Sequence, residues 1–379
     1  MTKPIYLDYN ATTPHDPEVI GAMRPFLEEE FGNPSSSHLY GSAPQKAVME
    51  ARAQVADLLN CSPDEIIFTS GGTESNNHAI KGVAEAYGAK GNHIITSQIE
   101  HPAILEVCNY LEKKGMEVTY VPVDGQGMVR VSAVGGAITA RTILITIMHA
   151  NNEVGTLQPI AEIAQIAKEQ GILLHTDAAQ SVGKISTEVD TLGVDLLSIA
   201  GHKVYAPKGV GALFIRDGLN LAKFMHGAGQ ESGRRPGTEN VLEIVGLGKA
   251  CEIAGRDLEA NMTHMQYMRD RLYEGLKGSC GNIRVNGHPQ KQLPNTLSIS
   301  FEGLEANRIL DAIESKVAAS AGAACHSDRV EVSQVLKAMG VPLNWAKGTL
   351  RLTTGRRTTE ADIDTAVQVI CEAVKTLKN

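Results

Sequence analysis

The chain has 379 residues, more than one typical domain, so a large domain joined to a smaller one is the expected organisation. Hydrophobic residues make up 42% of it, enough for a sizeable core, while the net charge of −8 argues against nucleic-acid binding, which needs a basic patch. No apolar run reaches the roughly 18 residues of a membrane-spanning helix. The N-terminus begins with a strand-like segment instead of the apolar core of a secretion signal.

Six cysteines are scattered along the chain without a CxxC pair, namely Cys61, Cys108, Cys251, Cys280, Cys325 and Cys371. This spacing argues against a zinc site and against a disulfide framework, and it favours the reducing cytoplasm. Only Cys325 has an unusual setting. Residues 319–328 around it are mostly small, so we expect a loop that lacks packing side chains and can move.

The N-terminal part alternates strands and helices. A polar segment at 7–14 is expected to cross the domain surface, and a loop is expected at 32–37. Helices are predicted at 43–59, 73–87 (with Thr73 as N-cap), 102–114, 132–138 and 159–170. Strands are predicted at 65–70, 93–98, 117–123, 142–148, 172–176, 196–199 and 212–215. This alternation predicts the α/β class, with a mainly parallel sheet covered by helices on both faces.

The pattern changes after residue 238. Residues 239–276 are mostly helical, followed by strands at 282–285, 296–301 and 349–353 and helices at 306–316, 333–339 and 359–377. Such an arrangement predicts a small α+β domain. We therefore expect a large domain at 1–255 and a small C-terminal domain at 256–379 that carries the Cys325 loop, with residues 1–20 able to pack against the small domain.

Two strand-to-helix turns carry candidate binding residues. In the segment 70–76, Gly71, Gly72 and Thr73 follow a strand and open a helix, which offers backbone N–H groups to a phosphate. The segment lacks the lysine of a Walker loop and the third glycine of the dinucleotide fingerprint, and an ordinary glycine turn is the alternative. His101, after the next strand, could stack on an aromatic cofactor, shuttle protons or cap the following helix.

Further polar residues end the later strands. Asn152 follows the strand at 142–148, and Asp177 ends the next strand, where it could hold a protonated ring nitrogen with Gln180 nearby. The pair His175 and Asp177 could instead ligate a metal, but no third ligand of matching type is evident, so no metal is predicted.

Lys203 follows the strand at 196–199 in a Gly-His-Lys sequence. A partly desolvated lysine there would lose its proton easily enough to react with an aldehyde, although a solvated surface lysine is the common alternative. The carboxyl ends of parallel strands share one edge, so Thr73, His101, Asn152, Asp177 and Lys203 are expected to converge. Pyridoxal 5′-phosphate (PLP) is the cofactor that these groups together indicate. It needs a lysine for its aldehyde, an acid for its ring nitrogen, a side-chain ring to stack on it and backbone N–H groups for its phosphate.

With these residues assembled, the chain resembles the class V aminotransferase-like family of PLP-dependent enzymes of fold type I, and within it the NifS-like cysteine desulfurases and selenocysteine lyases. The resemblance covers essentially the whole length. It rests on segments in family order, namely 7–13, 68–76, 150–153, 175–180, 201–203, 235–240, 322–325 and 350–356. It implies a large domain with a mainly parallel seven-stranded sheet and a small α+β domain.

The resemblance also implies roles around the cofactor ring. Lys203 binds the cofactor covalently and later moves the substrate's α-proton. Asp177 keeps the pyridine nitrogen protonated, so that the ring serves as an electron sink. His101 stacks on the ring as a further catalytic residue, and Gln180 hydrogen-bonds the phenolic oxygen.

At the phosphate, the resemblance implies binding by Gly72, Thr73 and His202, joined by Thr238 of the partner subunit, so the active enzyme is a homodimer. At the substrate, Asn152 and Arg351 hold the carboxylate, with Asn33 as a further contact. Cys325 attacks the substrate sulfur as a thiolate, and the products are alanine and a persulfide on Cys325.

Some positions depart from the desulfurase pattern. Ala200 stands where many cysteine desulfurases have a hydroxyl residue that contacts the phosphate. Ala200, the segment 235–238 and the segment 325–328 resemble the selenocysteine lyase branch, whereas Pro102 and the segment 148–152 resemble the NifS branch. The resemblance therefore leaves L-cysteine and L-selenocysteine both open as substrates.

The interpretation is a cytoplasmic homodimeric enzyme that releases sulfur or selenium and leaves alanine, serving iron–sulfur cluster, thio-cofactor or selenium metabolism. Sulfur- or selenium-acceptor proteins are further candidate partners, and no nucleic acid or membrane is expected. Three alternatives remain: a dedicated selenocysteine lyase, a transaminase of the same fold, and a non-catalytic scaffold that binds sulfur-carrier proteins.

Overall fold

The computed structural model describes residues 3–326 and 329–378, and the side chains of residues 323–331 lie outside that description. Its larger part is built on a seven-stranded sheet in the order β2-β8-β7-β6-β5-β3-β4. The strands are β2 (Ile66–Thr69), β3 (His93–Ser97), β4 (Glu117–Val121), β5 (Thr142–Thr146), β6 (Leu173–Asp177), β7 (Leu196–Ala200) and β8 (Gly211–Ile215). β8 runs antiparallel to both neighbours, and the other pairs are parallel. The predicted α/β class with a mainly parallel seven-stranded sheet is confirmed.

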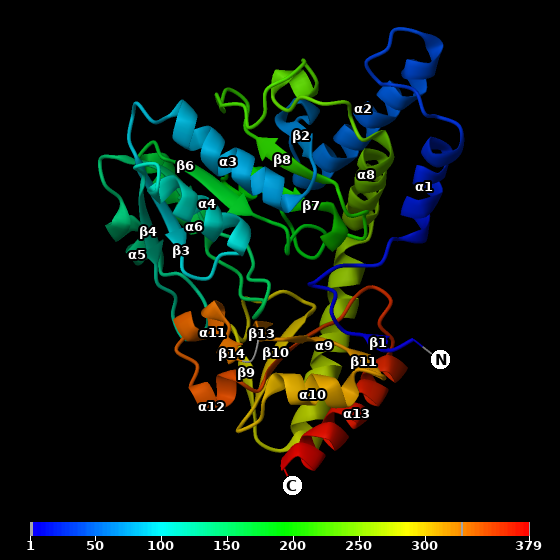
Figure 1. Ribbon diagram of the computed structural model, residues 1–379, viewed down its shortest axis with the longest axis vertical. Coiled ribbons are helices and arrows are strands. Elements are labelled where there is room, and N and C mark those ends of the chain that lie inside the picture. Colours follow the sequence, from blue (N-terminus) through cyan, green and yellow to red (C-terminus); the bar gives the residue numbers. More distant parts are fainter. Residues whose placement is uncertain (1–2, 327–328, 379) are drawn as a thin grey trace.

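Helices cover both faces of this sheet, as Figure 1 shows. Successive residues of a strand point to opposite faces of the sheet. Ile67 and Leu213 lie on one face, where they pack against α3 (Gly72–Ala86) and α4 (Pro102–Glu112). Ile66 and Phe214 face the other way. They pack in the cluster that includes residues of α2 (Leu39–Leu59), α6 (Ile160–Glu169) and α8 (Val241–Arg256). The remaining helices of this part are α1 (Pro17–Glu28), α5 (Val131–Ala137) and α7 (Val189–Leu192).

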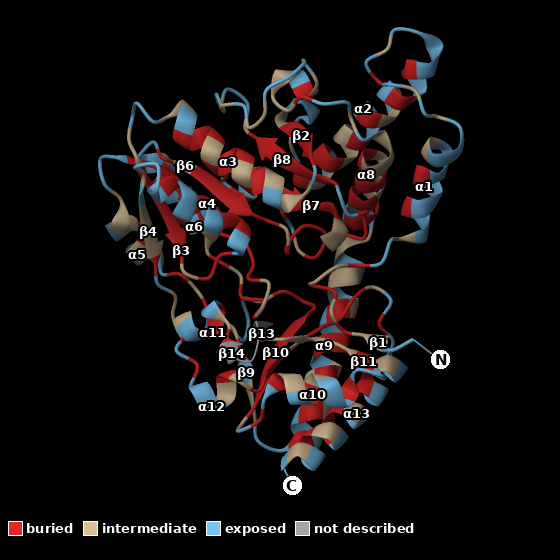
Figure 2. Cartoon of the chain, viewed as in Figure 1, coloured by how far each residue is buried: buried red, intermediate tan, exposed pale blue. Residues whose placement is uncertain are grey.

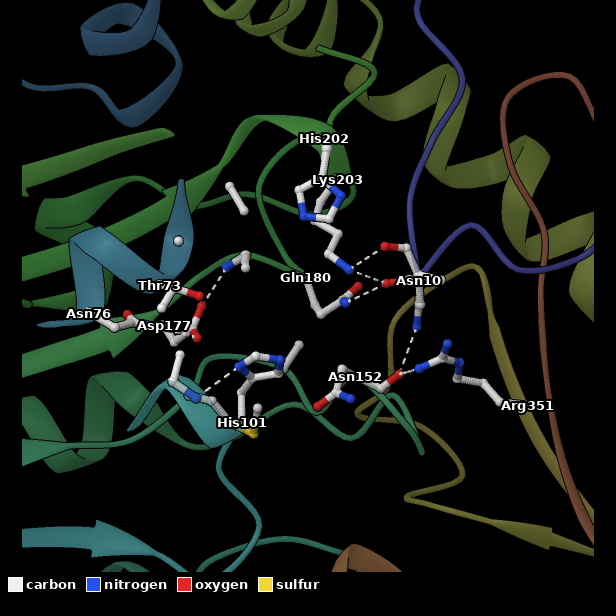
Figure 3. A pocket seen from close by; sticks show the side chains of 17 residues that line it. Asn10, Thr73, Asn76, His101, Asn152, Asp177, Gln180, His202, Lys203 and Arg351 are labelled. Carbon is white, nitrogen blue, oxygen red and sulfur yellow. Dashed lines mark hydrogen bonds between the residues drawn. The ribbon is translucent and has the colours of Figure 1, made fainter. Parts of the chain in front are cut away.

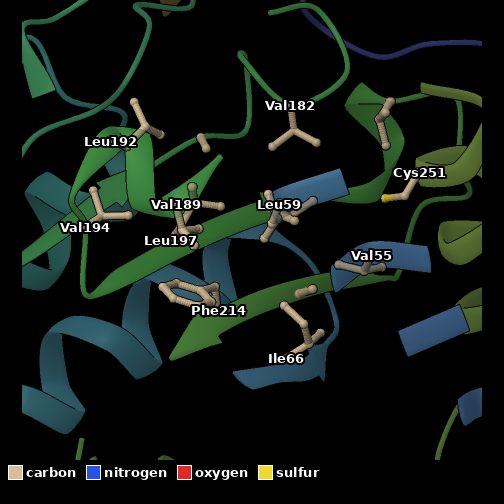
Figure 4. Packing of buried hydrophobic residues seen from close by; sticks show 14 of the residues in the cluster. Val55, Leu59, Ile66, Val182, Val189, Leu192, Val194, Leu197, Phe214 and Cys251 are labelled. Atoms are coloured by element: carbon tan, nitrogen blue, oxygen red, sulfur yellow. The ribbon is translucent and has the colours of Figure 1, made fainter. Parts of the chain in front are cut away.

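The core against α2 and α8 is dense and apolar. Figure 4 shows Phe214 and Leu197 from adjacent strands near Leu59 and Val55 of α2 and Cys251 of α8. Burying each such side chain contributes roughly 1.5–3 kcal/mol relative to exposure. This packing fixes β7, whose C-terminal end leads directly into Lys203.

The smaller part is built on a four-stranded antiparallel sheet in the order β12-β15-β10-β9. These strands are β9 (Ile283–Asn286), β10 (Thr296–Phe301), β12 (Ser320–Ala321) and β15 (Thr349–Thr353). Residues of α9 (Leu258–Cys280), α10 (Ala306–Ile313) and α13 (Glu360–Lys378) form a second core against it. The short helices α11 (Gln334–Ala338) and α12 (Leu343–Ala346) complete this part. Figure 2 shows the buried residues concentrated on both sheets and on the helix faces turned toward them.

The N-terminal segment joins the two parts. β1 (Ile5–Tyr6) pairs in parallel with β11 (Val317–Ala318), and the chain then runs to α1 (Figure 1). The predicted surface path of residues 7–14 is wrong, because Leu7, Asn10 and Thr13 are buried. α8 ends at Arg256 and α9 begins at Leu258, so the predicted boundary near residue 255 falls at this helix junction. The division into domains 1–255 and 256–379 stays a prediction.

Two local predictions differ from the structure. The N-cap of α3 is Gly71 and not Thr73, because the strand-to-helix turn needs a φ of +145°, which glycine adopts without a steric penalty. The expected loop at 319–328 contains strands: β12 is followed by β13 (Ala323–His326), which pairs antiparallel with β14 (Arg329–Val332). Small residues do not prevent such a hairpin, since its ladder is made by backbone groups.

The prediction that the cysteines form no disulfide is wrong for one pair. Cys280, the last residue of α9, is bonded to Cys371 in α13, 91 positions later in the sequence. Both residues are buried in the core of the smaller part, where the two helices pack together. Sequence spacing gives no sign of this pairing, because the approach of the helices creates it.

Among the helices of the described residues, none is both long enough and apolar enough to span a bilayer.

Candidate active site

A cavity of about 270 Å³ lies at the carboxyl edge of the large sheet. Its lining includes residues of β6, of the turns after β3, β5 and β7, of the start of α3 and of β15, and Figure 3 shows their side chains. The sequence-predicted residues that line it are Gly72, Thr73, His101, Asn152, Asp177, Gln180, His202, Lys203 and Arg351. The expected convergence of strand-end residues is therefore confirmed.

Asp177 is the buried acid of this cavity. Its Oδ2 accepts a hydrogen bond from Asn76 Nδ2 at 2.7 Å, and its Oδ1 accepts one from Ala179 N at 2.9 Å. Each carboxylate oxygen is thus held by one donor, which fixes the orientation of the group. An acid held in this way can accept a further hydrogen bond from a protonated ring nitrogen.

Lys203 ends the turn that follows β7. Its Nζ donates to the backbone oxygens of Asn10 at 2.5 Å and Ala11 at 2.7 Å, as the dashed lines to Asn10 in Figure 3 show. Burial, followed by the positive charge of Arg351, lowers the pKa of Lys203 from 10.5 to about 8. A substantial fraction of the amine is therefore neutral near physiological pH, the form that reacts with an aldehyde.

The two histidines of the cavity differ in setting. His101 is the N-cap of α4: its Nδ1 accepts from Ala103 N at 3.1 Å while its ring is exposed to the cavity. His202 Nδ1 lies 3.2 Å from Thr12 Oγ1. Burial is the main cause that lowers the pKa of both rings, that of His202 to about 4, so His202 is neutral at physiological pH.

The start of α3 forms one end of the cavity. Gly72 and Thr73 lie in the first turn, where backbone N–H groups have no partner within the helix. A Cβ added to Gly72 would lie 3.2 Å from Ala200 Cβ, so the two small residues allow this turn to approach the end of β7. The arrangement suits an anion such as phosphate.

Arg351 lies on β15 of the smaller part. Its Nη2 pairs with Asp8 Oδ1 at 2.8 Å, its Nη1 donates to the backbone oxygen of Asn152 at 3.2 Å, and its buried Nε has no hydrogen-bond partner among the described residues. Asp8 Oδ2 accepts from Ser320 Oγ at 2.9 Å. Arg351 therefore brings a positive charge to the cavity edge beside Asn152.

Sequence reasoning missed two residues of this site. Asn10 is almost fully buried, lines the cavity, and contacts both parts of the molecule through Lys203 Nζ, Asn152 O and Thr296 Oγ1. Asn76 lines the cavity from inside α3. Asn76 follows Gly72 by one helical turn, and this spacing is the available signal for it.

Two predicted residues do not line the cavity, and the side chain of a third lies outside the described residues. Asn33 is exposed, and its Oδ1 accepts from Ser35 N in a tight turn. Thr238 is exposed beside a separate hollow together with Ser70 and Arg235. Cys325 belongs to β13, and its side chain lies outside the described residues. Their roles stay predictions.

The metal alternative for His175 and Asp177 finds no support in the geometry. Both ring nitrogens of His175 have hydroxyl partners: Nδ1 lies 2.8 Å from Thr146 Oγ1, and Nε2 lies 2.9 Å from Ser198 Oγ. Within the described part of the chain, no group of three or more His, Cys, Asp and Glu residues could hold a metal ion.

The residues present fit PLP. The cavity brings together an amine with a lowered pKa at Lys203, a held carboxylate at Asp177, a ring at His101 and the open first turn of α3. Arg351, which also lines the cavity, adds a guanidinium group for a substrate carboxylate. This is the set of groups that an aldehyde cofactor with a pyridine ring and a phosphate requires.

Comparison with known proteins supports this assignment. The family model described as aminotransferase class V matches residues 5–366, and the chain belongs to this family. Cysteine desulfurase IscS of Dictyoglomus turgidum is 48% identical over 379 residues, which cover 100% of this chain and 96% of that protein. Cysteine desulfurase IscS of Methanosarcina thermophila is also 48% identical, over 100% of this chain and 93% of that protein. The chain is thus a member of the cysteine desulfurase group within the class V family.

Solved structures support the same family assignment. A NifS-like protein superposes with a TM-score of 0.93 at 38% identity, covering 99% of this chain and 100% of that one. The structure named "SspA in complex with cysteine" superposes with a TM-score of 0.82 at 37% identity, covering 94% of this chain and 100% of that one. The resemblance to the NifS-like family is therefore confirmed.

Proposed function

We propose that this protein is a PLP-dependent cysteine desulfurase that removes the sulfur of L-cysteine and leaves L-alanine. The observation that carries the proposal is the cavity in which the Lys203 amine, with its pKa lowered to about 8, lies together with the held carboxylate of Asp177. The relatives named cysteine desulfurase, nearly half identical over the full length, support the choice of substrate.

Bound PLP would supply an electron sink for the substrate's Cα–H and C–S bonds. Lys203 would hold the cofactor and carry the α-proton, Asp177 would accept a hydrogen bond from the ring nitrogen, and His101 would stack on the ring. Gly72, Thr73 and His202 would surround the phosphate. Arg351 and Asn152 would bind the substrate carboxylate and orient the side-chain sulfur.

For sulfur release we propose attack by the Cys325 thiolate on the substrate sulfur. The new S–S bond forms as the C–S bond breaks, the electron pair of the C–S bond goes to the carbon side, and protonation there gives alanine. The sulfur remains on Cys325 as a persulfide, which an acceptor thiol or acceptor protein can take. L-Selenocysteine is the second candidate substrate, since the same steps apply to selenium and Ala200 resembles the selenocysteine lyase branch.

The proposal includes a homodimer. Large apolar side chains are exposed around the end of α1 and the start of α2, among them Leu27, Phe31 and Leu39 at 68%, 80% and 87% exposure. A second copy covering this region would remove them from water. Thr238, exposed outside the cavity of its own chain, is available to complete the phosphate site of the partner.

A cytoplasmic location is also part of the proposal, and it rests on family membership. The Cys280–Cys371 disulfide is the observation that bears against it, because such bonds seldom persist in a reducing compartment.

The test of the cofactor and substrate is spectroscopic and kinetic. Purified protein incubated with PLP and passed through a desalting column is expected to keep a visible absorption band, and Lys203→Ala is expected to lose it. Turnover of L-cysteine and L-selenocysteine, each with and without a thiol acceptor, then measures the preference between sulfur and selenium. Cys325→Ser is expected to abolish release from L-cysteine. A wild-type protein that stays colourless, or a Cys325→Ser variant with full activity on both substrates, would contradict the proposal.

A further inference from the structure

Lys184 is a buried lysine just behind the cavity wall. It is only 4% exposed, and it has no ion-pair partner in the described part of the chain. Its Nζ donates two hydrogen bonds to neutral side chains, to Gln180 Oε1 at 2.9 Å and to Asn10 Oδ1 at 3.2 Å. Burying a lysine away from any carboxylate is costly, so a purely structural role would be served better by an apolar residue.

The N–H groups of the Lys184 amine orient the two neighbouring amides. Burial, followed by the positive charges of Lys203 and Arg351, lowers the pKa of Lys184 well below its usual value, and the amine carries N–H groups in both protonation states. Lys184 Nζ donates to Gln180 Oε1, so the Gln180 amide has its oxygen turned toward Lys184. Gln180 Nε2 is then left to donate, and it reaches the backbone oxygen of Asn10 at 3.0 Å at the cavity wall. Figure 3 shows the Gln180 side chain directed toward Asn10 in this way.

The same reasoning applies to Asn10. Its Oδ1 accepts from Lys184 Nζ and from Asn295 Nδ2, which leaves its Nδ2 to donate to Asn152 O at 3.2 Å and Thr296 Oγ1 at 2.9 Å. The backbone oxygen of this residue also accepts from Lys203 Nζ. Lys184 Nζ is therefore a common donor to two amides beside the reacting lysine.

We propose that Lys184 is a positioning residue of the active site, which fixes the Gln180 amide so that its N–H, and not its oxygen, faces the cofactor. The inference rests on the proposed function, in which the phenolic oxygen of PLP lies against Gln180 and needs a donor. Lys184 touches neither the cofactor nor the substrate. It acts through Gln180, with Asn10 held alongside.

The experiment is a double-mutant cycle on PLP affinity. The dissociation constant of PLP is measured from absorbance for the wild type, Lys184→Met, Gln180→Ala and the double variant. Lys184→Met is similar in length but cannot donate, so the Gln180 amide keeps only its bond to the backbone oxygen of Asn10 and is oriented less firmly, and we expect PLP to bind about tenfold more weakly. In the Gln180→Ala background the same replacement is expected to change the constant by less than about twofold, because there is no amide left to orient.

The controls separate positioning from stability. Lys168→Met, on the exposed side of α6, is expected to leave PLP binding unchanged. Lys184→Arg keeps N–H donors at this position and is expected to retain most of the affinity. If Lys184→Met does not fold, as judged by circular dichroism, Lys184→Leu, which also lacks a donor, replaces it in the cycle, with the same expected non-additivity.

Two outcomes would overturn the inference. One is an unchanged PLP dissociation constant in the Lys184 variant. The other is a double variant whose loss of affinity equals the product of the two single losses. Both require a wild type that binds PLP. A wild type that binds none would instead count against the proposed function, so the two failures are distinguishable.

Discussion

The amide of Asn76 in α3 donates a 2.7 Å hydrogen bond to Asp177 Oδ2 at the end of β6, while its own Oδ1 is buried with no hydrogen-bond partner in the described part of the chain. Helix α3, whose first turn forms one end of the cavity, therefore also holds Asp177 at the opposite end of the proposed cofactor site. An unpaired buried amide oxygen costs free energy, so this orientation is maintained by the hydrogen bond to the carboxylate.

Replacing Asn76 with alanine is expected to weaken PLP binding. The variant loses a hydrogen bond to a carboxylate, an interaction that contributes about 1.5–3 kcal/mol, so the PLP dissociation constant should rise about ten- to hundredfold. Absorbance titration measures it. Asn77→Ala, on the next position of the same helix, is the matched control, because Asn77 bonds only the backbone oxygen of Thr73 among the described residues. Equal constants for the two variants would contradict the role of Asn76.

Replacing Arg351 with lysine is expected to raise KM for L-cysteine about tenfold while PLP affinity stays unchanged. Lysine keeps the charge but loses the fork that binds a carboxylate at two points. Steady-state alanine formation measures KM. Arg357→Lys serves as the control, because Arg357 is exposed and donates only to His15 O among the described residues. An unchanged KM in the Arg351 variant would remove Arg351 from the substrate site.

Glu100 gives a pH-dependent prediction. Burial is the main cause that raises the pKa of this carboxyl from 4.5 to about 8, while Ser97 Oγ donates to it at 2.5 Å and Met148 N at 3.0 Å. The folded protein therefore keeps a proton that the unfolded chain loses above pH 4.5, and stability falls as the pH rises from 4.5 to 8. The slope from this one group is about 1.4 kcal/mol per pH unit.

The variant Glu100→Gln removes that titration. Its free energy of unfolding, measured in urea, should equal that of the wild type near pH ~5 and exceed it increasingly up to pH ~8. A difference that does not change with pH would show that Glu100 does not carry the proton.

The disulfide gives a prediction about stability. A bond between Cys280 and Cys371 closes a long loop that contains the smaller sheet, and such bonds typically contribute about 2–4 kcal/mol. Reductant should therefore lower the free energy of unfolding of the wild type by about that amount, and it should not affect Cys280→Ser. Thiol titration of the denatured wild type should find two fewer thiols without reductant than with it. A full set of free thiols in protein purified without reductant would contradict the disulfide.

Most of the sheet, and a good part of the site, could be predicted from the sequence. Apolar strand runs and helix spacings are local signals, and the rule that parallel strands share a carboxyl edge is enough to bring His101, Asp177 and Lys203 together. This rule could not predict contacts between residues that are far apart in the sequence. Asn10 lies in a polar segment typical of a surface, yet it is buried because β1 pairs with β11 and carries it between the two parts.

The other differences have the same physical origin. The Cys280–Cys371 bond depends on how α9 packs against α13, which no spacing along the chain reveals. The small residues around Cys325 favour a loop because they pack weakly, whereas backbone pairing of β13 with β14 needs no large side chains. The cap of α3 lies at Gly71 because the turn requires a positive φ.

The most direct measurement is the product balance with L-cysteine as the only substrate. Protein loaded with PLP, given L-cysteine and a thiol acceptor but no α-keto acid, is expected to form alanine and sulfide in equal amounts, and Lys203→Ala is expected to form neither. Alanine that appears only when pyruvate is added as the amino-group acceptor would indicate a transaminase. The absence of alanine under every condition, from a folded wild type that binds PLP, would contradict the assignment of desulfurase chemistry to this cavity.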